Sequence, residues 1–293
     1  MTDAARLHGR ADALAARIPP LLIEAESLAQ TVILGEHGRR RPGHGTEFWQ
    51  YRQAMPGDPA RLIDWRRSAR SDTAFVQDKE WHAAQTVMIR VDPSASMRFT
   101  SSAGVPSKAE RARLLALALA VLLAHAGERV GLLDADHPPR RGTAHLAAMA
   151  ARLMDETAHE HDTPDAADLP VSSRAVLMSD FLGDLASVEA TITEATKRGV
   201  RGALVQVLDP AEEGFPFDGR TIFESMGGGI RHETLDAGEL RSRYLARLAE
   251  RKDRLALLAR QAGWQMTVHH TDTPATSALL WLHGALSRRR GIG

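Results

Sequence analysis

Three short polar clusters in the sequence carry the residue types that bind a hard divalent cation. They are Asp92-x-Ser94-x-Ser96, Gly142-Thr143 and Ser179-Asp180. Among the candidate ligands, two offer carboxylates (Asp92, Asp180) and three offer hydroxyls (Ser94, Ser96, Thr143). Mg²⁺ prefers such oxygen donors while keeping several of its waters. In the first cluster the alternate residues can face one way on a turning loop, so all three side chains can point at one ion. The pattern predicts a metal site.

The same residue types also suit a purely structural role. Asp-x-Ser-x-Ser is good turn and helix-cap chemistry, because these side chains satisfy free backbone amides. Thr143, at the start of an amphipathic stretch, is by itself typical of a helix N-cap. The order and spacing of the three clusters within one α/β pattern favour a shared metal site over three separate caps.

Alternating strands and helices position these clusters from residue 86 onward. Strands are predicted at 86–92, 129–135, 174–180, 200–209 and 264–270, and helices at 107–126, 143–155, 184–198, 238–262 and 275–289, with a small hairpin insertion at 216–235. Helical crossovers between strands imply a mostly parallel, doubly wound α/β sheet with helices on both faces. Ligands collect outside the carboxyl ends of such strands, where the strand order reverses. We expect all three clusters near that rim.

The first 80 residues have a different character. Residues 3–28 read as a helix interrupted at Pro19-Pro20, and residues 35–80 are basic and rich in Gly and Pro. We therefore divide the chain into an N-terminal helix with a basic segment, residues 1–80, that packs on a main domain, residues 81–293. Asp64, Arg66, Arg67 and Arg70 are expected to form ion pairs that pin the segment, with Trp65 as an apolar anchor.

Composition excludes several classes of function. The 293-residue chain balances 37 Lys+Arg against 37 Asp+Glu, which argues against whole-molecule attraction to nucleic acid or anionic membranes. It contains no Cys, so disulfides, thiolate metal sites and a cysteine nucleophile are excluded. The longest apolar run, Leu114 to Ala124, is too short to span a bilayer, and no export signal is visible. We expect a cytoplasmic protein.

Other chemistry-bearing patterns are weaker. His159-Glu160-His161-Asp162 is not His-Glu-x-x-His and lies in an acidic stretch, so we interpret it as a solvated loop. His269-His270 ends a strand, where alternation sends the rings to opposite faces and predicts that one is buried and has its hydrogen bonds satisfied. Nucleophile-elbow, phosphate-loop and dinucleotide-binding motifs are missing from the sequence. Apart from the ligand acids, only Asp134 and Asp136 could act as a general base near the rim, so we expect no enzyme.

Two sets of residues resemble known families. Asp92-x-Ser94-x-Ser96 followed by Thr143 and Asp180 resembles the metal-ion-dependent adhesion site of von Willebrand factor A domains. An upstream block comprises Gly45-Thr46-Glu47-Phe48, Tyr51-Arg52, Pro56-Gly57-Asp58, Arg61-Leu62-Ile63-Asp64-Trp65-Arg66 and Ser68-Ala69-Arg70. This block is similar to the signature of the bacterial domain-of-unknown-function family fifty-eight. Members of that family carry an A-type domain and are often encoded beside MoxR-type AAA+ ATPases.

The resemblance implies a fold, a metal and a role. The fold would be von Willebrand factor A-like, with Ser94, Ser96 and Thr143 as direct ligands of Mg²⁺ or Mn²⁺ and with Asp92 and Asp180 acting through bound water. An open coordination position could accept a carboxylate from a partner. The implied role is a non-enzymatic protein–protein interaction module, an adaptor or co-chaperone of a MoxR-type ATPase.

Two alternatives remain open at this point. The basic residues between Arg39 and Arg70 could form a nucleic-acid surface, although acids interleave with them and aromatic residues are few. The metal could instead assist hydrolysis, which would need a general base within reach of the substrate.

Overall fold

A computed structural model describes residues 20–37, 48–55, 60, 63–69, 73–79, 84–133, 137–155, 166–226, 229 and 231–287 of the chain. Its contacts divide the chain into two compact units. One contains the chain up to Gly38 together with Gln85–Gly293, and the other contains Arg39–Ala84. The predicted motif 159–162, the acids Asp134 and Asp136 and the arginines 39–41 and 70 lie outside the described residues.

A five-stranded sheet forms the centre of the larger unit. Its strands are β3 (Thr86–Val91), β4 (Arg129–Leu132), β5 (Arg174–Ser179), β6 (Arg201–Leu208) and β9 (Gln265–His270). They pair in the order β4-β3-β5-β6-β9, and all four pairings are parallel. β3 lies between the next two strands of the chain, so the strand order reverses between β3 and β5. The predicted α/β class and parallel sheet are confirmed.

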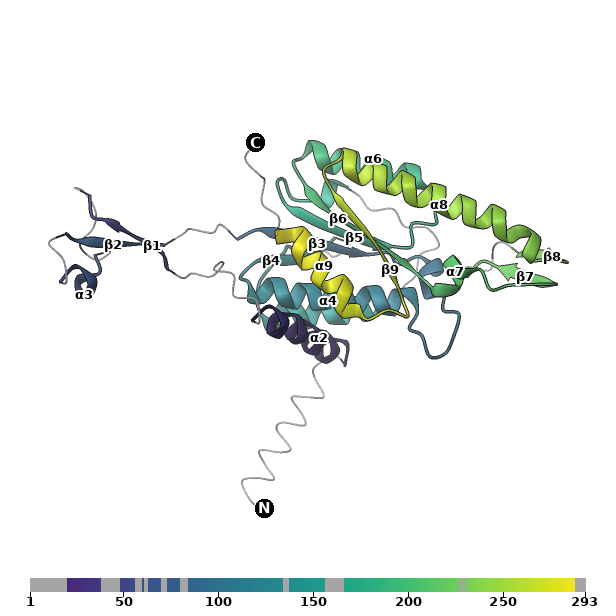
Figure 1. Ribbon diagram of the computed structural model, residues 1–293, viewed down its shortest axis with the longest axis horizontal. Coiled ribbons are helices and arrows are strands. Elements are labelled where there is room, and N and C mark those ends of the chain that lie inside the picture. Colours follow the sequence, from purple (N-terminus) through teal and green to yellow (C-terminus); the bar gives the residue numbers. More distant parts are fainter. Residues whose placement is uncertain are drawn as a thin grey trace, which may run out of the picture. The chain divides into compact units, whose positions relative to one another are not determined.

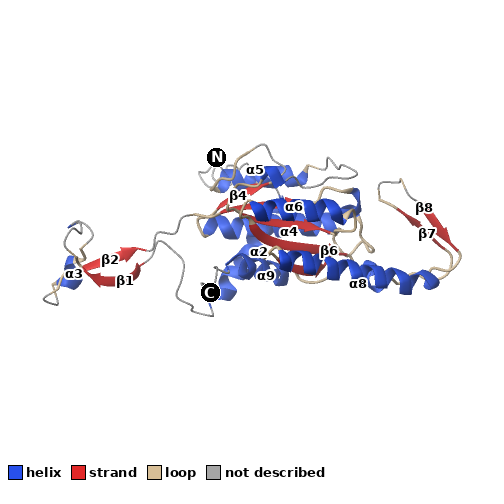
Figure 2. Cartoon of the chain, turned by 90° about the horizontal axis from the view of Figure 1, so that it is seen from above, coloured by secondary structure: helices blue, strands red, loops and turns tan. Residues whose placement is uncertain are grey.

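Four helices form two layers on one side of this sheet, and the first of them in chain order packs on the second rather than on the strands. They are α2 (Pro20–His37), α4 (Lys108–His125), α5 (Thr143–Met154) and α9 (Ala275–Ser287), and they share one apolar cluster with β3, β5 and β6 (Figures 1 and 2). α4 is buried along most of its length because residues 114–124 are all Leu, Ala or Val. A capping box starts α4: Ser107 Oγ accepts the N–H of Glu110, whose side chain accepts the N–H of Ser107.

The other face is covered by α6 (Leu185–Lys197) and α8 (Gly238–Gln261). Ile192 and Ala195 of α6 and Leu255 and Ala259 of α8 pack in a second apolar cluster with Leu177 and Leu204 of the sheet. The sheet is therefore covered on both faces, as predicted. Between β6 and α8 lie the short helix α7 (Pro210–Gly214) and an antiparallel hairpin of β7 (Thr221–Glu224) and β8 (Arg231–Thr234), which confirms the predicted insertion.

The smaller unit is an antiparallel pair of β1 (Phe48–Gln53) and β2 (Phe75–Lys79) with the short helix α3 (Trp65–Ser68). Asp64 caps α3, because its Oδ1 accepts the N–H of Arg67 at 3.0 Å. The Trp65 side chain is 63% exposed. The expected docking of this segment on the main domain stays a prediction.

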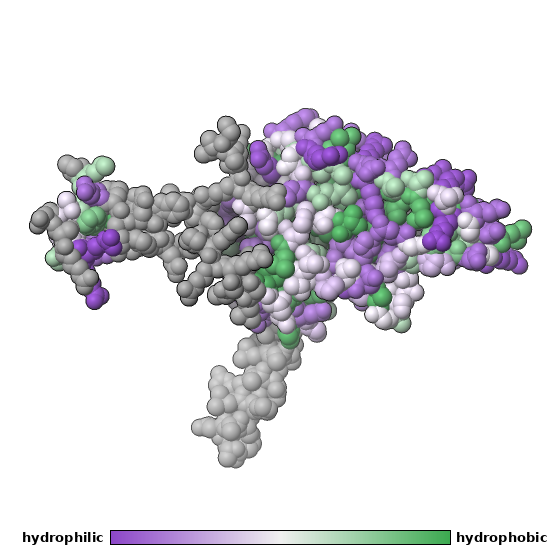
Figure 3. Space-filling view, viewed as in Figure 1, coloured by the Kyte–Doolittle hydropathy of each residue, from purple (hydrophilic) through white to green (hydrophobic). Residues whose placement is uncertain are grey.

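Most predicted boundaries agree with the structure to within a residue or two, but two do not. α2 extends to His37, beyond the predicted end at Leu28, because Leu22, Ala25, Ala29 and Val32 continue one apolar face onto α4. β4 ends at Leu132, short of the predicted Ala135. Among the described helices, none is long and apolar enough to cross a membrane. On the face drawn in Figure 3, apolar residues form small patches interrupted by polar ones.

Candidate functional site

The site lies at the carboxyl rim, defined here as the edge of the sheet where β3, β5, β6 and β9 end. Asp92 directly follows β3, and Asp180 directly follows β5. The two strands are neighbours, and the Asp92 N–H donates to the carbonyl of Met178 at 2.9 Å, which continues their pairing. Both acids therefore lie at the point where the strand order reverses, as the sequence predicts.

The loop after β3 folds around Asp92. Its Oδ1 accepts the N–H of Ser94 at 2.8 Å, and its Oδ2 accepts the hydroxyl of Ser179 at 2.5 Å. The hydroxyls of Ser94 and Ser96 lie 3.0 Å apart. Asp92, Ser94 and Ser96 are all half-buried, and the short 3-10 helix η2 (Ala95–Arg98) holds the loop turned over the end of the strand. The structure thus brings together the side chains of Asp92, Ser94, Ser96 and Ser179.

A buried lysine occupies the other half of the rim. The Lys108 ammonium, at the start of α4, donates to Asp180 Oδ2 at 2.8 Å and to Glu212 Oε1 at 2.6 Å. It also lies 5.8 Å from the centroid of the Phe99 ring. Lys108 and Asp180 are each 1% exposed. A buried cation is stable only with such partners, so Lys108, Asp180 and Glu212 form one closed ion cluster.

Burial and pairing set the protonation of this ion cluster. Burial lowers the pKa of Lys108, but the carboxylates of Asp180 and Glu212 together outweigh it, and the pKa is raised above its ordinary value. Burial raises the pKa of Glu212 above its ordinary value, although Lys108 opposes the shift. Lys108 is therefore an ammonium at neutral pH.

The backbone after β5 turns sharply to place Asp180. Phe181 has φ +50°, a left-handed conformation that is uncommon for a residue with a bulky side chain. Burial of the Phe181 ring in the second apolar cluster offsets this strain. The turn is held further by the N–H of Leu182, which donates to Asp180 Oδ1 at 2.9 Å, and by Gln206 Nε2, which donates to the Asp180 carbonyl at 2.9 Å.

Thr143 does not lie with the other four predicted residues. Val130, near the amino end of β4, exchanges two hydrogen bonds of 3.0 Å with Arg140, and its carbonyl lies 2.8 Å from His145 Nε2. α5 therefore starts at the amino end of the sheet, and Gly142 is its N-cap. Val130 is level with Val87, which lies about 16 Å along the strand from Asp92. The expectation that Thr143 lies near the carboxyl rim is corrected.

The side chains at the rim fit the predicted metal poorly. Asp180 already forms an ion pair with the Lys108 ammonium, and Asp92 already accepts two hydrogen bonds. Thr143 lies at the other end of the sheet. The remaining candidate metal ligands are the hydroxyls of Ser94 and Ser96, and among the described residues neither has a carboxylate or ammonium partner. Within the described ranges, no group of three or more His, Asp or Glu side chains could hold a metal ion. Magnesium binding stays a prediction, and a lysine supplies positive charge beside Asp180.

Sequence reasoning did not identify Lys108 and Glu212 as members of this site. One signal was available: a lysine in the first turn of a helix is disfavoured by the positive end of the helix dipole, and Lys108 opens a helix that is apolar from Leu114 to Ala124. A charge in that position needs a buried partner. Glu212 gave no such signal, since its capping box with Asp209 accounts for it locally. Its pairing with Lys108 joins residues 104 positions apart.

The two histidines that end β9 differ in burial as predicted, but the buried ring is not fully satisfied, because His269 Nε2 has no hydrogen-bond partner among the described residues. His269 is buried at 4% exposure, and His270 is half-buried and pairs with Glu213. The pKa of His269 is lowered to about 4, chiefly by burial and also by the charges of Arg111 and His270, while Asp272 opposes the shift. His269 is therefore neutral at pH 7, with Nδ1 3.2 Å from the Thr273 hydroxyl.

Comparison with known proteins places this arrangement in context. The family model described as "Protein of unknown function DUF58" matches residues 50–254. Two uncharacterised proteins of Mycobacterium tuberculosis, Rv1480 of strain H37Rv and MT1527 of strain CDC 1551, are each 26% identical over 295 residues, covering 95% of this chain and 90% of theirs.

Two solved structures are also similar. An aerotolerance-related membrane protein of Bacteroides fragilis aligns with a TM-score of 0.44 at 16% identity, over 69% of this chain and 98% of that one. The conserved hypothetical protein BatB of Bacteroides thetaiotaomicron aligns with a TM-score of 0.40 at 13% identity, over the same shares of the two chains.

Proposed function

We propose, for a chain that belongs to the DUF58 family of proteins of unknown function, a non-enzymatic role in protein–protein interaction at the carboxyl rim. One observation carries the proposal. The rim combines a closed ion cluster with a half-buried pair of hydroxyls, Ser94 and Ser96, that among the described residues have only each other as side-chain hydrogen-bond partners. Such a surface can exchange hydrogen bonds with an incoming partner without rearranging.

The engagement of the acids supports a role without catalysis. A general base must take a proton from a substrate, and a carboxylate that already accepts hydrogen bonds from charged or backbone donors is a weaker base. Asp92 accepts from Ser94 and Ser179, Asp180 accepts from Lys108 and Leu182, and Glu212 accepts from Lys108 and the N–H of Asp209. None of these three carboxyl groups is poised beside an unpaired nucleophile among the described residues.

The partner we propose is a MoxR-type AAA+ ATPase, with this chain as its adaptor or co-chaperone. This finer statement is based on the resemblance of the sequence motifs to the family's pattern. Two forms of this interaction differ in whether binding needs Mg²⁺. A Mg²⁺ ion at the rim would attract an acidic group of the partner, so binding would need the metal. If Lys108 takes the place of that ion, Ser94 and Ser96 make the contact and binding does not need it.

The test is binding of the purified chain to the nucleotide-free MoxR-type ATPase encoded in the same genome, measured by biolayer interferometry. Ser94→Ala with Ser96→Ala should weaken binding by about tenfold or more, because both rim hydroxyls are removed. Thr143→Ala is the matched control, since Thr143 is exposed and lies at the opposite end of the sheet. Equal loss in both variants, or loss in neither, would contradict a rim interface.

The metal is tested in the same experiment. Binding is measured with Mg²⁺ and with a chelator, and the folded state of each variant is checked by thermal unfolding. Binding that persists in chelator but disappears in the double Ser variant supports the metal-free form. Binding that requires Mg²⁺ supports the form implied by the sequence motif.

A further inference from the structure

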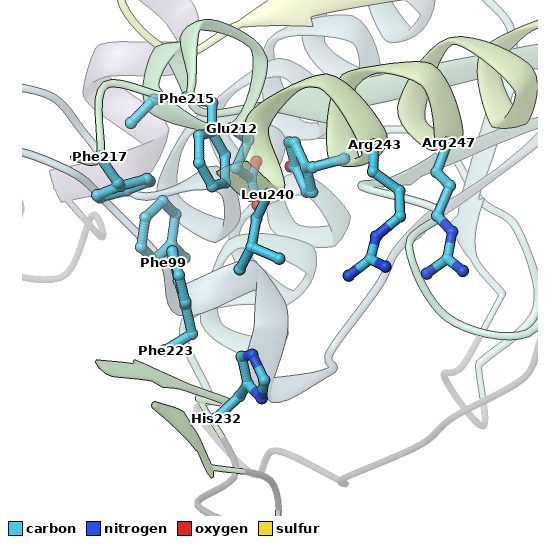
Figure 4. Close-up of a pocket in the computed structure, with 11 residues that line it drawn as sticks. Phe99, Glu212, Phe215, Phe217, Phe223, His232, Leu240, Arg243 and Arg247 are labelled. Carbon is cyan, nitrogen blue, oxygen red and sulfur yellow. The ribbon is translucent and has the colours of Figure 1, made fainter. Parts of the chain in front are cut away.

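A cavity beside the ion cluster is lined by five aromatic residues. Its volume is about 440 Å³, and its walls come from α7, the β7–β8 hairpin, the first half of α8 and the loop before α4 (Figure 4). The aromatic lining residues are Phe99, Phe215, Phe217, Phe223 and Tyr244. The whole chain has only 7 Phe and 2 Tyr, so more than half of these nine residues surround one cavity. This volume is in the range of small-molecule sites.

The rings are held in contact with one another. The Phe215 ring lies 5.2 Å from Phe217, 5.8 Å from Phe223 and 5.0 Å from Tyr244, between centroids. Phe215 is buried and adopts φ +43°, which costs free energy for a residue that is not glycine. A cluster that served only to attach the hairpin would be expected to close over these rings, because protein interiors are close-packed. Here an open cavity remains between them.

Two arginines supply charge at the same cavity. Arg243 and Arg247 line it from successive turns of α8 and project to the same side of the helix (Figure 4). Both are exposed, and neither makes a hydrogen bond or ion pair with a described residue. The one acid in the lining, Glu212, has its Oε1 on Lys108 and its Oε2 on the N–H of Asp209. The two guanidinium groups are therefore available to an anion.

We propose that this aromatic pocket binds a small amphipathic carboxylate, with its apolar body between the rings and its acid group at Arg243 and Arg247. The apolar lining favours an aliphatic or aryl body, and two guanidinium groups favour a single acid head group over a neutral one. A standard protein interface buries roughly 800 Å² of surface on each partner, and the lining of this pocket offers far less. This inference is independent of the proposed role of the rim.

The experiment measures binding of octanoate and of its neutral analogue octanamide to the full chain, by calorimetry and ligand-detected NMR. Octanoate should bind more tightly than octanamide. Arg243→Gln with Arg247→Gln should weaken octanoate by about tenfold or more and leave octanamide nearly unchanged, because only the acid loses its charged partners. Arg260→Gln, on the exposed far end of the same helix, is the matched control and should bind octanoate as the wild type does.

A second variant tests the cavity itself. Leu240→Trp places a larger side chain in the lining and should abolish binding of both compounds while the chain stays folded. The proposal is overturned if octanoate does not bind at millimolar concentration. It is equally overturned if octanoate and octanamide bind alike, or if the paired Arg variant and Arg260→Gln bind octanoate equally well.

Discussion

Glu212 belongs to both the carboxyl rim and the aromatic pocket, but the cations of the two regions differ: the rim cation is buried and paired, and the pocket cations are exposed. At the rim the Lys108 ammonium is 1% exposed and has two carboxylate partners. At the pocket Arg243 and Arg247 are exposed beside apolar rings without a described acid partner. Buried charges must be paired for the chain to fold, whereas exposed, unpaired charges can contribute their interaction free energy to a ligand. The comparison separates residues that maintain the structure from residues available for binding.

The largest expected effect comes from removing the cation of the ion cluster. Lys108→Met leaves the carboxyl groups of Asp180 and Glu212 without their cation, which should lower the free energy of unfolding by about 3–5 kcal/mol in urea denaturation. Lys197→Met is the matched control, because Lys197 pairs with Glu194 on the surface and should lose only about 0.5 kcal/mol or less.

A compensated variant distinguishes charge from packing. Lys108→Met combined with Asp180→Asn and Glu212→Gln removes all three charges, so it should regain part of the loss. If Lys108→Met were no more costly than Lys197→Met, the account of a closed ion cluster would be wrong.

A smaller effect is expected from acid, and it concerns the one rim histidine that is buried without an acidic hydrogen-bond partner. The pKa of His269 is lowered to about 4 by burial, with Arg111 and His270 adding to the shift and Asp272 opposing it. The folded-state pKa lies below the unfolded value near 6.5, so this contribution is fully present above pH 6.5 and is lost as the pH falls through 4. The loss should approach about 3 kcal/mol.

The measurement compares unfolding free energies of the wild type and His269→Gln between pH 7 and pH 4. The difference between the two pH profiles isolates this histidine from the other groups that titrate in the same range. Parallel profiles would show that His269 keeps its ordinary pKa in the folded chain.

The pocket arginines should contribute almost nothing to stability. Arg243→Gln with Arg247→Gln removes no ion pair among the described residues, so the free energy of unfolding should stay within about 0.5 kcal/mol of the wild type. Urea denaturation beside Lys108→Met makes the contrast direct. A loss of several kcal/mol would mean that these arginines, too, have a structural role.

The smallest expected effect is that of magnesium on the unliganded chain. A ligand that binds only the folded state raises the midpoint of thermal unfolding, and one that does not bind leaves it unchanged. Because Lys108 already neutralises Asp180, we expect no shift between Mg²⁺ and chelator. A clear rise with Mg²⁺ would restore the metal site that the sequence motif predicts and would show that the ion cluster rearranges.

Local pattern was sufficient to predict most of the larger unit. The capping box of Ser107 and Glu110, the left-handed Gly127 after α4 and the Asp184 cap of α6 are interactions within a few residues, so the sequence reports them directly. The positions of Asp92 and Asp180 also followed, because parallel strands end at one rim. Thr143 was misplaced because the pairing of Arg140 with Val130 turns the chain back along the edge of the sheet, and no periodicity records that bridge.

The sequence by itself determined the helices, the strands, their parallel arrangement and two acids at the switch in strand order, since each depends on short-range pattern or on a general rule of α/β sheets. Only the tertiary structure decided what surrounds those acids. Lys108 meets Glu212 across 104 positions, and Phe99 joins the rings of residues 215–244 in one cavity. Such contacts are set by how whole elements pack, and the free energy of a buried charge or an open pocket depends on that packing.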